Sequence, residues 1–439
     1  MTECNQTILP FASSQKRKVE ASFSGGSVSS DGGLIFLQEV ERKLQLSKRI
    51  AQLLPDHRAT HKILHQQKHM IKQRLLSLCA GYEDLNDQDT LRHDILLQTL
   101  VGRSDPLASA STLCRMENRS NRQTMIALQK LLVELFIQKH QNNPPKELIL
   151  DFDATDDPTH GNQEGSFYHG YYKHECFLPL YVFCGSDPLC ALLRPSNTDG
   201  ARGAWAVLKI LVSKFREQWG NTINITFRGD TGFMRPRMLT WCEKNKVNYI
   251  TGYSKNARLL EQSKELIKQS KNQYEATKEK QRLFGEYQYK AGSWALSRKI
   301  IMKAEHTHRG ENNRYIVTNL EGDPQELYDK VYCARGDMEN RIKEQQMGLF
   351  ADRTSCSKWW ANQLRLLLST FAYVLIDYFR TNALAGTDWA KLQCSSIRTK
   401  LLKIGAVIIR NTRRVRIHLS SAYPYQEMFI KAHQKMLSG

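Results

Sequence analysis

The sequence contains no apolar run long enough to cross a membrane. Its most apolar stretch, Leu366 to Ile376, holds 11 residues between two charged side chains, whereas a membrane-spanning helix needs roughly 20. The basic residues Lys16 to Lys18 are not followed by an apolar segment, so this region does not have a signal-peptide pattern. These absences predict a protein that works in the cytoplasm.

Paired cysteines, internal repeats and low-complexity blocks are also absent. The ten cysteines are scattered along 439 residues without a CxxC pair, which favours reduced thiols over a disulfide framework. A hydrophobic content of 41% with 9% aromatic residues excludes a disordered chain. A chain of this length is expected to form about two to four structural units with a sizeable core.

Acidic residues are few relative to basic ones. The chain has 63 lysines and arginines against 44 aspartates and glutamates, a formal net charge of +19. Residues 151–254 have 11 side chains of each sign, whereas residues 351–439 have 14 basic and 4 acidic side chains. A neutral centre with basic flanks predicts a polyanionic partner, with nucleic acid as the first choice. The alternative is a basic surface that has no partner.

The chain divides near the linker Asn143 to Pro145. Before it, apolar residues recur every three or four positions, which predicts a mostly helical N-terminal domain over residues 1–145. The helices expected there include one over residues 34–54 and one over residues 61–80.

After the linker, short apolar runs alternate with helical stretches, which is typical of an α/β fold. We expect a ribonuclease-H-like mixed sheet in a catalytic domain over residues 146–253 and 313–395. The polar, Lys-rich segment 254–312 is expected to be a β-rich insertion, and residues 396–439 a basic C-terminal tail.

Acidic side chains stand at the ends of the predicted strands. Asp151 and Asp153 lie two residues apart on one strand, so both point to the same face, and Asp230 ends another strand. Strand ends that lie side by side would bring these carboxylates together, and Mg²⁺ relieves the repulsion between them. Two such ions about 3.5–4 Å apart catalyse phosphodiester cleavage or transfer. The alternative is that the acidic run through Asp156 and Asp157 is ordinary turn chemistry.

A third carboxylate lies on a predicted helix near residues 331–346. Tyr332, Arg335, Glu339 and Lys343 are spaced by three, four and four residues, so they share one helical face. Such a face offers a carboxylate for metal, two cations for phosphate and a phenol. A solvated face with a Glu339–Lys343 pair is the alternative.

Several stretches of the sequence resemble one protein family. LDFDATDDPTHGNQEG, FRGDTGF and YCARGDMENRIKE resemble insertion-sequence transposases of the DDE class, in the branch with a β-rich insertion before the glutamate. The YxxRxxxE signature is present as Tyr332, Arg335 and Glu339, but the Lys usual seven residues after the glutamate is Gln346 here. GYEDLNDQDTLRHD and LASASTLCRMEN also resemble a subgroup of these transposases, so the resemblance covers about residues 15–430.

The resemblance implies a catalytic and metal-binding triad of Asp153, Asp230 and Glu339, with Asp151 as the rival of Asp153. It also implies a metal cofactor, Mg²⁺ or Mn²⁺, and double-stranded DNA, both transposon ends and target, as the partner. Because two ends must be joined, we expect a homodimer on DNA and a nucleoid-associated location in the cytoplasm. Relatives that form hairpin ends stack a tryptophan of the insertion on a flipped base; Trp294 is the candidate, with a core tryptophan as the alternative.

Basic residues gather near the C-terminus, where seven lie between Arg398 and Arg416 without an acidic neighbour. A basic strand face there could follow a DNA backbone, or it could protect an edge strand from aggregation. The expected DNA-binding residues are Tyr332, Arg335, Lys343, Arg410, Arg413, Arg414 and Arg416.

The N-terminal helices are expected to read the sequence of the transposon end. The candidate residues are Lys62, Lys68, Lys72 and Arg74. His57, His61 and His65 would share one helical face, either as a zinc site or, more simply, as an exposed polar face.

We therefore interpret the chain as a transposase that binds terminal inverted repeats, cleaves phosphodiester bonds with a divalent metal and transfers 3′-hydroxyl ends to target DNA. The alternatives are a stand-alone metal-dependent nuclease and a non-catalytic DNA-binding protein derived from a decayed element.

Overall fold

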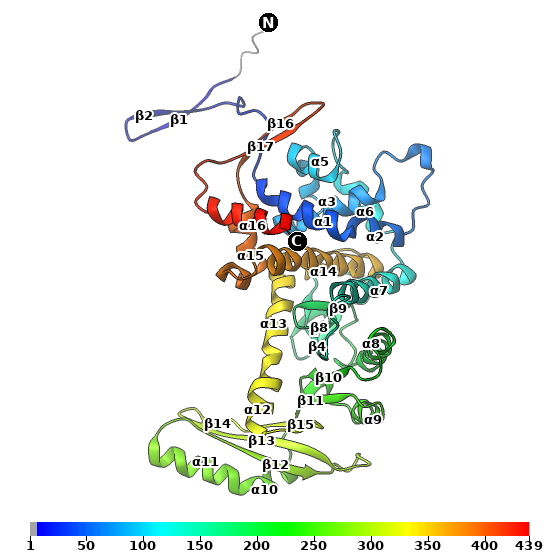
Figure 1. Cartoon of the computed structure of the whole chain (residues 1–439), viewed down its shortest axis with the longest axis vertical. Helices are drawn as coiled ribbons and strands as arrows, with labels where there is room; N and C mark the ends of the chain where they lie inside the picture. Colours follow the sequence, from blue (N-terminus) through cyan, green and yellow to red (C-terminus); the bar gives the residue numbers. More distant parts are fainter. Residues whose placement is uncertain (1–6, 439) are drawn as a thin grey trace. The chain divides into compact units, whose positions relative to one another are not determined.

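The computed structural model describes residues 7–438, so the ends of the expected domains at residues 1–6 and at Gly439 lie outside the described part. The chain forms two units (Figure 1). The helical unit comprises the described residues up to Ser120 with residues 348–350 and 371 onward, and the sheet unit comprises residues 121–347 and 351–370. Within the described residues no helix is both long and apolar enough to cross a membrane.

A mixed sheet forms the centre of the sheet unit. Three of its strands are parallel neighbours, in the order β4, β10, β11, and β8 and β9 continue the sheet beyond β4 in antiparallel pairing. This strand order confirms the expected ribonuclease-H-like α/β fold. The bounds of the strands are β4 (Glu147–Ala154), β8 (Leu180–Cys184), β9 (Asp187–Leu192), β10 (Asn224–Gly229) and β11 (Asn248–Tyr253).

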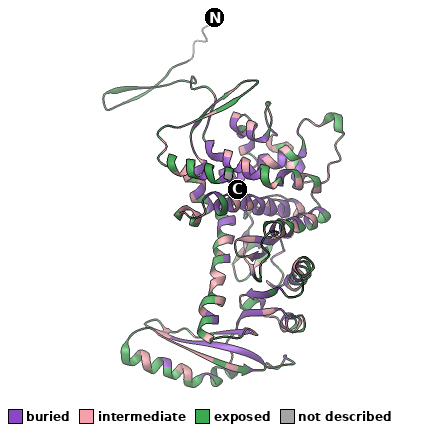
Figure 2. Ribbon diagram, viewed as in Figure 1, coloured by how far each residue is buried: buried purple, intermediate pink, exposed green. Residues whose placement is uncertain are grey.

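Strand β4 shows why the sheet forms and how it presents its carboxylates. Leu148, Leu150 and Phe152 alternate along the strand and are all buried in one hydrophobic core. Figure 2 draws the buried residues of the chain in purple. Because side chains alternate between faces, Asp151 and Asp153 point to the opposite face. The apolar face thus fixes the side on which the acidic residues emerge.

Helices cover the apolar face of the sheet. Helix α8 (Ala204–Trp219) contributes Leu208, Leu211 and Phe215 to the same core as β4, and α9 (Pro236–Lys244) contributes Met238 and Leu239. Helix α7 (Arg122–Lys139) binds the outer strand β9, since Gln129 Nε2 donates to the carbonyl of Ala191 at 2.5 Å.

Residues 254–312 extend the central sheet rather than standing beside it. Strand β15 pairs antiparallel with β11, β13 pairs with β15, and β12 pairs with β13. Each strand leaves backbone N–H and C=O groups without partners along its outer edge, and the next strand forms hydrogen bonds with them. The elements of this segment are α10 (Ala257–Gln262), α11 (Lys264–Thr277), β12 (Gln281–Tyr289), β13 (Arg298–Thr307) and β14 (Gly310–Glu311), and β15 (Arg314–Thr318) follows directly after it.

Trp294, between β12 and β13, is a core residue. It is 3% exposed, and its ring packs against the rings of Tyr253 and Tyr289 with centroid distances of 5.4 and 5.7 Å. The Arg298 guanidinium lies 4.8 Å from the ring centroid. A base could not reach this buried ring, so the core interpretation is the correct one of the two.

The helical unit is built around α3, whose side chains are nearly all buried. The sequence predicted one helix over residues 34–54, but the chain makes two, because Gln45 adopts a left-handed conformation with φ of +53°. The helices of the N-terminal part are α1 (Ile35–Leu44), α2 (Leu46–Leu53), α3 (Gln67–Ala80), α4 (Asp87–Leu91), α5 (Ile95–Val101) and α6 (Ala110–Glu117).

The prediction of a helix beginning at His61 was wrong. Helix α3 starts at Gln67, and the preceding loop is held by ion pairs from Asp56 to Arg58 and Arg119, at 2.6 and 2.8 Å. The three histidines therefore do not share a helical face. Among residues 7–438 no cluster of three His, Cys, Asp or Glu side chains suited to a metal ion is found.

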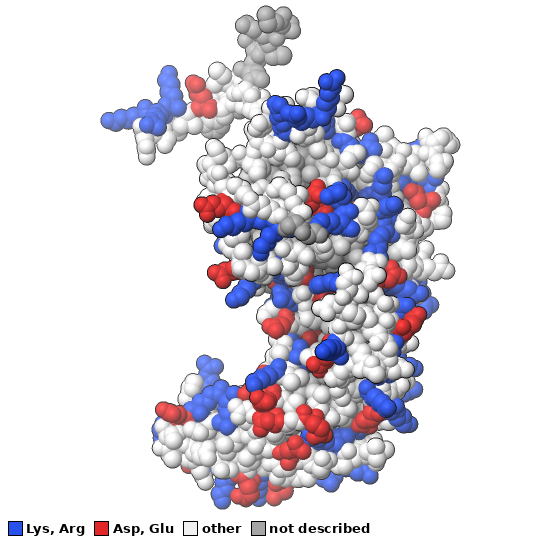
Figure 3. Space-filling view, viewed as in Figure 1, with Lys and Arg blue, Asp and Glu red and all other residues white. Residues whose placement is uncertain are grey.

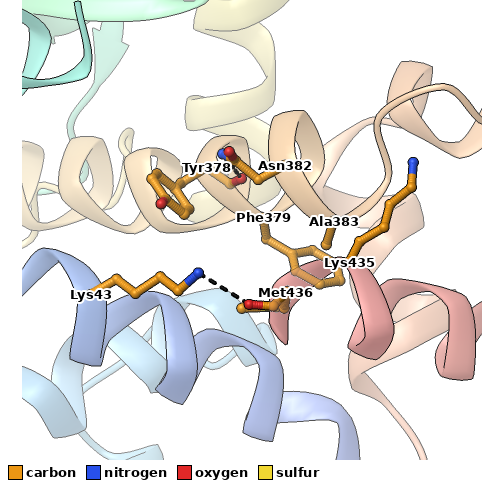
Figure 4. Close-up of a pocket in the computed structure, with 7 residues that line it drawn as sticks. All are labelled: Lys43, Tyr378, Phe379, Asn382, Ala383, Lys435 and Met436. Atoms are coloured by element: carbon orange, nitrogen blue, oxygen red, sulfur yellow. Dashed lines mark hydrogen bonds between the residues drawn. The ribbon is translucent and has the colours of Figure 1, made fainter. Parts of the chain in front are cut away.

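The C-terminal segment belongs to the helical unit. Strands β16 (Ala406–Arg410) and β17 (Val415–Leu419) form a sheet with β3 (Val28–Ser29). Helices α15 (Cys394–Ile397) and α16 (Gln426–Ser438) belong to the same unit. A pocket of about 250 Å³ lies beside α16, and Lys43 Nζ donates a hydrogen bond there to the carbonyl of Met436 at 3.1 Å. Figure 4 shows the side chains that line it. The contact ties α1 to the C-terminal helix.

Candidate active site

Two of the predicted carboxylates stand at one edge of the central sheet. Strands β4 and β10 are parallel, and Phe152 is the register partner of Gly229, so Asp153 and Asp230 follow at neighbouring positions. Asp230 also begins a short turn of 3₁₀ helix, where its Oδ1 accepts a hydrogen bond from Gly232 N at 2.8 Å. The carboxyl ends of parallel strands meet at the same edge, which explains why residues 77 positions apart converge.

The third carboxylate reaches the same place from an irregular helix. After α12 (Pro324–Glu326) the chain makes a π-helical segment to Tyr332, a 3₁₀ turn to Arg335 and then α13 (Gly336–Lys343). Arg335 lies between two carboxylates: Nη2 is 2.6 Å from Glu339 Oε1, and Nη1 is 3.7 Å from Asp153 Oδ1. Departures from α-helical geometry of this kind are frequent at functional sites.

The negative charges of Asp230 and Glu339 affect the pKa of Asp153. Burial raises the pKa of Asp153 to about 7; the Arg335 guanidinium opposes this shift, and the charges of Asp230 and Glu339 add to it. Burial disfavours the charge of Arg335, yet Asp153 and Glu339 outweigh it and raise the pKa of Arg335. Arg335 therefore pairs with two of the three mutually repelling carboxylates, Asp153 and Glu339.

Asp151, the rival for the first position, is engaged elsewhere. It is buried, and its Oδ2 accepts a hydrogen bond from Arg228 Nη2 at 2.7 Å, while its Oδ1 accepts from Arg228 Nε. Arg228 Nη1 also donates to the carbonyl of Val331 at 2.5 Å, immediately before Tyr332. The pair thus connects β4 and β10 to the helix that carries Glu339.

Tyr332 packs close to the strand end. A Cβ atom on Gly252 would lie 2.8 Å from the Tyr332 hydroxyl and 2.5 Å from Thr231 Oγ1, both closer than real Cβ contacts. Only glycine therefore fits at position 252 of β11 without displacing these groups. Burial raises the pKa of Tyr332, so it stays a phenol that can donate a hydrogen bond.

Gln346 stands where the resemblance predicts a lysine, and it has a structural contact. Its Nε2 donates to the carbonyl of Asp156 at 2.8 Å, which ties the helix after Glu339 to the loop after Asp153. Lys343 is exposed on the same helix.

A groove opens next to Asp230. Its volume is about 740 Å³, and Thr231, the residue after Asp230, and Tyr332 both line it. Most of the other side chains are aromatic, amide or basic, including Tyr253, Lys255, Asn313 and Arg314, and the lining also contains Ser254, Leu260 and the acidic Glu311. Such a lining suits a nucleic-acid strand, whose phosphates need cations and whose bases need flat rings.

The predicted basic residues near the C-terminus differ from one another in their contacts. Arg410 donates to the carbonyls of Arg103 and Ser104, at 3.3 and 2.9 Å, so its guanidinium is occupied within the helical unit. The other three are exposed at the turn and strand after it, and we call them the basic turn: Arg413, Arg414 and Arg416. Figure 3 shows lysine and arginine side chains spread widely over the visible face.

Two of the four N-terminal candidates are exposed, Lys62 and Lys68. Arg74 is not available to DNA, because it is 2% exposed and its Nε lies 3.2 Å from the carboxylate of Glu117. Burial lowers the pKa of Lys72. Helical periodicity alone could not distinguish the buried cation from the exposed ones.

The donor set at the sheet edge fits a divalent metal in kind. Three carboxylates are the hard oxygen ligands that Mg²⁺ and Mn²⁺ prefer, although among the described residues they are not arranged as a group that could hold a metal ion. Burial is the main cause of the raised pKa of Asp153, and the charges of Asp230 and Glu339 add to it, so a cation would relieve the repulsion. In the described structure Arg335 supplies the only cation paired with both Asp153 and Glu339.

A ribonuclease-H-like sheet with carboxylates at two central strand ends and a third on a following helix defines the class of DDE nucleic-acid-processing proteins. The chain belongs to the family described as transposase DDE domain group 1, whose family model matches residues 11–438. It is therefore a DNA transposase, and DNA is its partner.

Among solved structures, the chain is similar to one described as a piggyBac transposase synaptic complex with hairpin DNA. The sequence identity is 11%, the match covers 85% of this chain and 80% of that chain, and the TM-score is 0.44. A comparison with curated proteins finds no match.

Proposed function

We propose that this transposase binds the terminal inverted repeats of an insertion sequence, cleaves the DNA there and transfers the 3′-hydroxyl ends to target DNA. The observation that carries the proposal is that Arg335 pairs with both Asp153 and Glu339, which come from distant segments of the chain. Burial raises the pKa of Asp153 to about 7, and the charges of Asp230 and Glu339 add to the shift. A surplus of negative charge at a strand edge, beside a groove with aromatic and basic lining, suits metal-dependent work on a phosphodiester.

Asp153, Asp230 and Glu339 would hold Mg²⁺, with Mn²⁺ as the substitute. When bound, the metal would activate a water molecule or the 3′-hydroxyl of the DNA as the nucleophile and would stabilise the leaving oxygen. Asp151 stays with Arg228 and keeps the site in place. Members of this family generally use divalent metals, which agrees with this assignment.

Arg335 and Tyr332 would orient the DNA strand. The planar guanidinium of Arg335 matches a phosphate group in two-point geometry, so it exchanges its carboxylate partners for the scissile phosphate. The phenol of Tyr332 donates to a neighbouring phosphate oxygen. Lys343 and the basic turn contact the backbone further away, and joining two ends requires a homodimer on DNA.

The test uses DNA that carries the inverted repeats flanking the reading frame. Asp153→Ala, Asp230→Ala and Glu339→Ala should each abolish Mg²⁺-dependent nicking while end binding changes less than about threefold. Asp337→Ala is the matched control, because Asp337 is an exposed carboxylate on the same helix. Nicking retained in all three variants would refute the triad.

A second measurement separates transfer from hydrolysis. A precut end with a free 3′-hydroxyl is incubated with plasmid, and joined product is measured. Joining supports the transposase proposal, whereas nicking without joining indicates a stand-alone nuclease. Binding without nicking by the unaltered chain indicates a non-catalytic DNA-binding protein.

A further inference from the structure

Residues 254–312, which we call the insertion, pack against the irregular helix that leads into the site. A hydrophobic cluster buries Tyr328, in the π-helical segment Leu327–Tyr332, together with Ile301 of β13. We call Leu327–Tyr332 the π segment. Helix α12, which precedes it, also contacts β12 and β13 (Figure 1). The insertion therefore lies against the stretch of backbone that leads to Arg335.

A row of charged side chains on β12 and β13 makes the polar part of this contact. Nη2 of Arg282 donates to Oδ1 of Asp329, which belongs to the π segment. Nε of Arg282 lies 3.6 Å from Oε2 of Glu305. Glu305 is 5% exposed and also pairs with Nζ of Lys303 at 3.0 Å and with Nζ of Lys280 at 3.1 Å. Arg282 therefore links the buried carboxylate of the insertion to the π segment.

Glu305 and Arg282 are both charged at neutral pH. Burial raises the pKa of Glu305, but hydrogen bonds, first among them that from Lys303, outweigh this effect and lower the pKa to about 2. The hydrogen bond to Asp329 raises the pKa of Arg282. Isolated exposed ion pairs contribute little, whereas several charges in a network hold their geometry. The row is thus suited to fix the position of Asp329.

Aromatic rings extend the contact from the insertion towards the site. The Tyr328 ring lies 5.6 Å from that of Phe284 on β12, and Nζ of Lys303 lies 5.5 Å from its centroid. The same ring lies 5.6 Å from that of Tyr332, measured between centroids. Because packed side chains transmit displacements, a shift of the insertion strands would reach Tyr332 through one intervening ring.

The π segment depends on contacts from outside the helix, because hydrogen bonds between residues i and i+5 are rare and occur mostly in single turns. Arg228 holds the carbonyl of Val331, and the insertion holds the side chain of Asp329. If the π segment became α-helical, one residue of slip would turn the following helix by about 100°. Arg335 would then no longer lie beside Asp153.

We infer that the insertion positions Arg335, and that Arg282 is its positioning residue, acting through Asp329 on the π segment. The inference rests on the proposed function, because that function gives Arg335 the scissile phosphate as its ligand. Arg282 lies on β12 and contacts carboxylates of the protein, so its effect on cleavage passes through the backbone of the π segment. The insertion thereby has a role in the active site of its own chain.

The test uses Arg282→Met, which keeps the aliphatic stem and removes the link to Asp329. Glu305 keeps its two lysine partners, and the side chain of Asp329 is 31% exposed, so neither carboxylate is left buried and unpaired. Nicking of inverted-repeat DNA at saturating DNA and Mg²⁺ should slow by about 10- to 100-fold, since a misplacement of about 1 Å can cost that much. The DNA concentration at half-maximal rate should change by less than about threefold.

A double-mutant cycle shows whether Arg282 acts through Asp329. Asp329→Asn alone should slow nicking to a similar extent, and the double variant should be no slower than either single variant, because both remove the same contact. Arg282→Lys keeps a cation at this position and should restore most of the rate. Glu286→Gln is the matched control: Glu286 lies on the same strand, and its partner Lys299, 3.7 Å away, is on β13 rather than in the π segment.

Hydrogen exchange gives a readout that does not depend on cleavage. In the protein without DNA and metal, Arg282→Met should speed the exchange of the π-segment amides by roughly tenfold or more, while the amides of β4 keep their protection. Glu286→Gln should exchange like the unaltered protein in both regions.

Three results would overturn the inference: unchanged nicking and exchange in Arg282→Met, a double variant whose loss is the product of the two single losses, or a rise in exchange that is equal in β4 and in the π segment. The last result would indicate a general loss of stability. If the unaltered protein does not nick, the proposed function is wrong, and the exchange measurements alone decide whether the insertion holds the π segment.

Discussion

The buried pair of Asp151 and Arg228 gives a sharp test of the architecture. Arg228→Met keeps the aliphatic stem but leaves Asp151, which is 3% exposed, without its cation. Removing one partner of a buried ion pair typically costs about 3–5 kcal/mol of unfolding free energy, because the other charge stays buried and unpaired. We expect a loss of this size in chemical denaturation, together with weaker cleavage, since Arg228 also holds the carbonyl of Val331.

The double variant Asp151→Leu with Arg228→Met tests whether the loss of stability comes from an unpaired buried charge or from altered packing. With neither charge present, the loss of stability should fall to about 1–2 kcal/mol or less. In Arg228→Met alone the pKa of Asp151 rises further above its unfolded value, since burial already raises it and Arg228 opposes that shift. A carboxyl group whose pKa is raised by folding adds its full stability below its unfolded pKa, and this contribution is lost as the pH rises through its folded pKa. The stability that Arg228→Met loses should therefore shrink as pH falls from 8 towards 4. A single variant that loses under 1 kcal/mol at pH 8 would refute the reasoning.

Three further outcomes follow from the site. Asp153→Asn should stabilise the metal-free protein by about 2–4 kcal/mol at pH 8 and little below pH 4. The pKa of Asp153 is about 7 in the folded protein, so its buried negative charge destabilises the fold only as the pH rises through that value, and asparagine carries no charge. Equal denaturation midpoints at pH 8 would contradict this. Gly252→Ala should cost about 1–3 kcal/mol and reduce cleavage, whereas Gly200→Ala, where a Cβ meets no atom within 4 Å, should be nearly neutral in both assays. Replacing the basic turn by alanines should reduce the slope of log affinity against log salt by roughly 0.9 for each lost phosphate contact; an unchanged slope removes these residues from the interface.

The sheet was predictable because its signals are local. The apolar run that ends in Asp151 and Asp153 predicts a buried strand with carboxylates at its end, and the order of strands and helices predicts the ribonuclease-H-like sheet, as the structure confirms. The partner of Asp151 was missed, although a signal was present. Arg228 stands inside an apolar strand, and a charge buried in a strand needs a partner on a neighbouring one; the two residues are directly in register.

The features that the sequence did not predict depend on backbone conformation or on packing between distant segments, and local sequence patterns do not indicate either. The break at Gln45 and the late start of α3 follow from a left-handed residue and from ion pairs in the preceding loop. The burial of Arg74 follows from Glu117, which lies on another helix. Helical spacing placed Arg74 beside Lys68 and Lys72 as if all three were equivalent, because periodicity describes one helix and not its neighbours.

Arg335 explains how such an acidic site can exist before metal arrives. Three carboxylates at one sheet edge repel one another, and burial makes the repulsion more costly. Arg335 sits between Asp153 and Glu339 and lowers the pKa of Asp153 from what burial alone would give. The same guanidinium has the shape to bind a phosphate. Under the proposed function, folding and DNA binding would compete for Arg335, and its release to a phosphate would leave the carboxylates in greatest need of a metal when the substrate is in place.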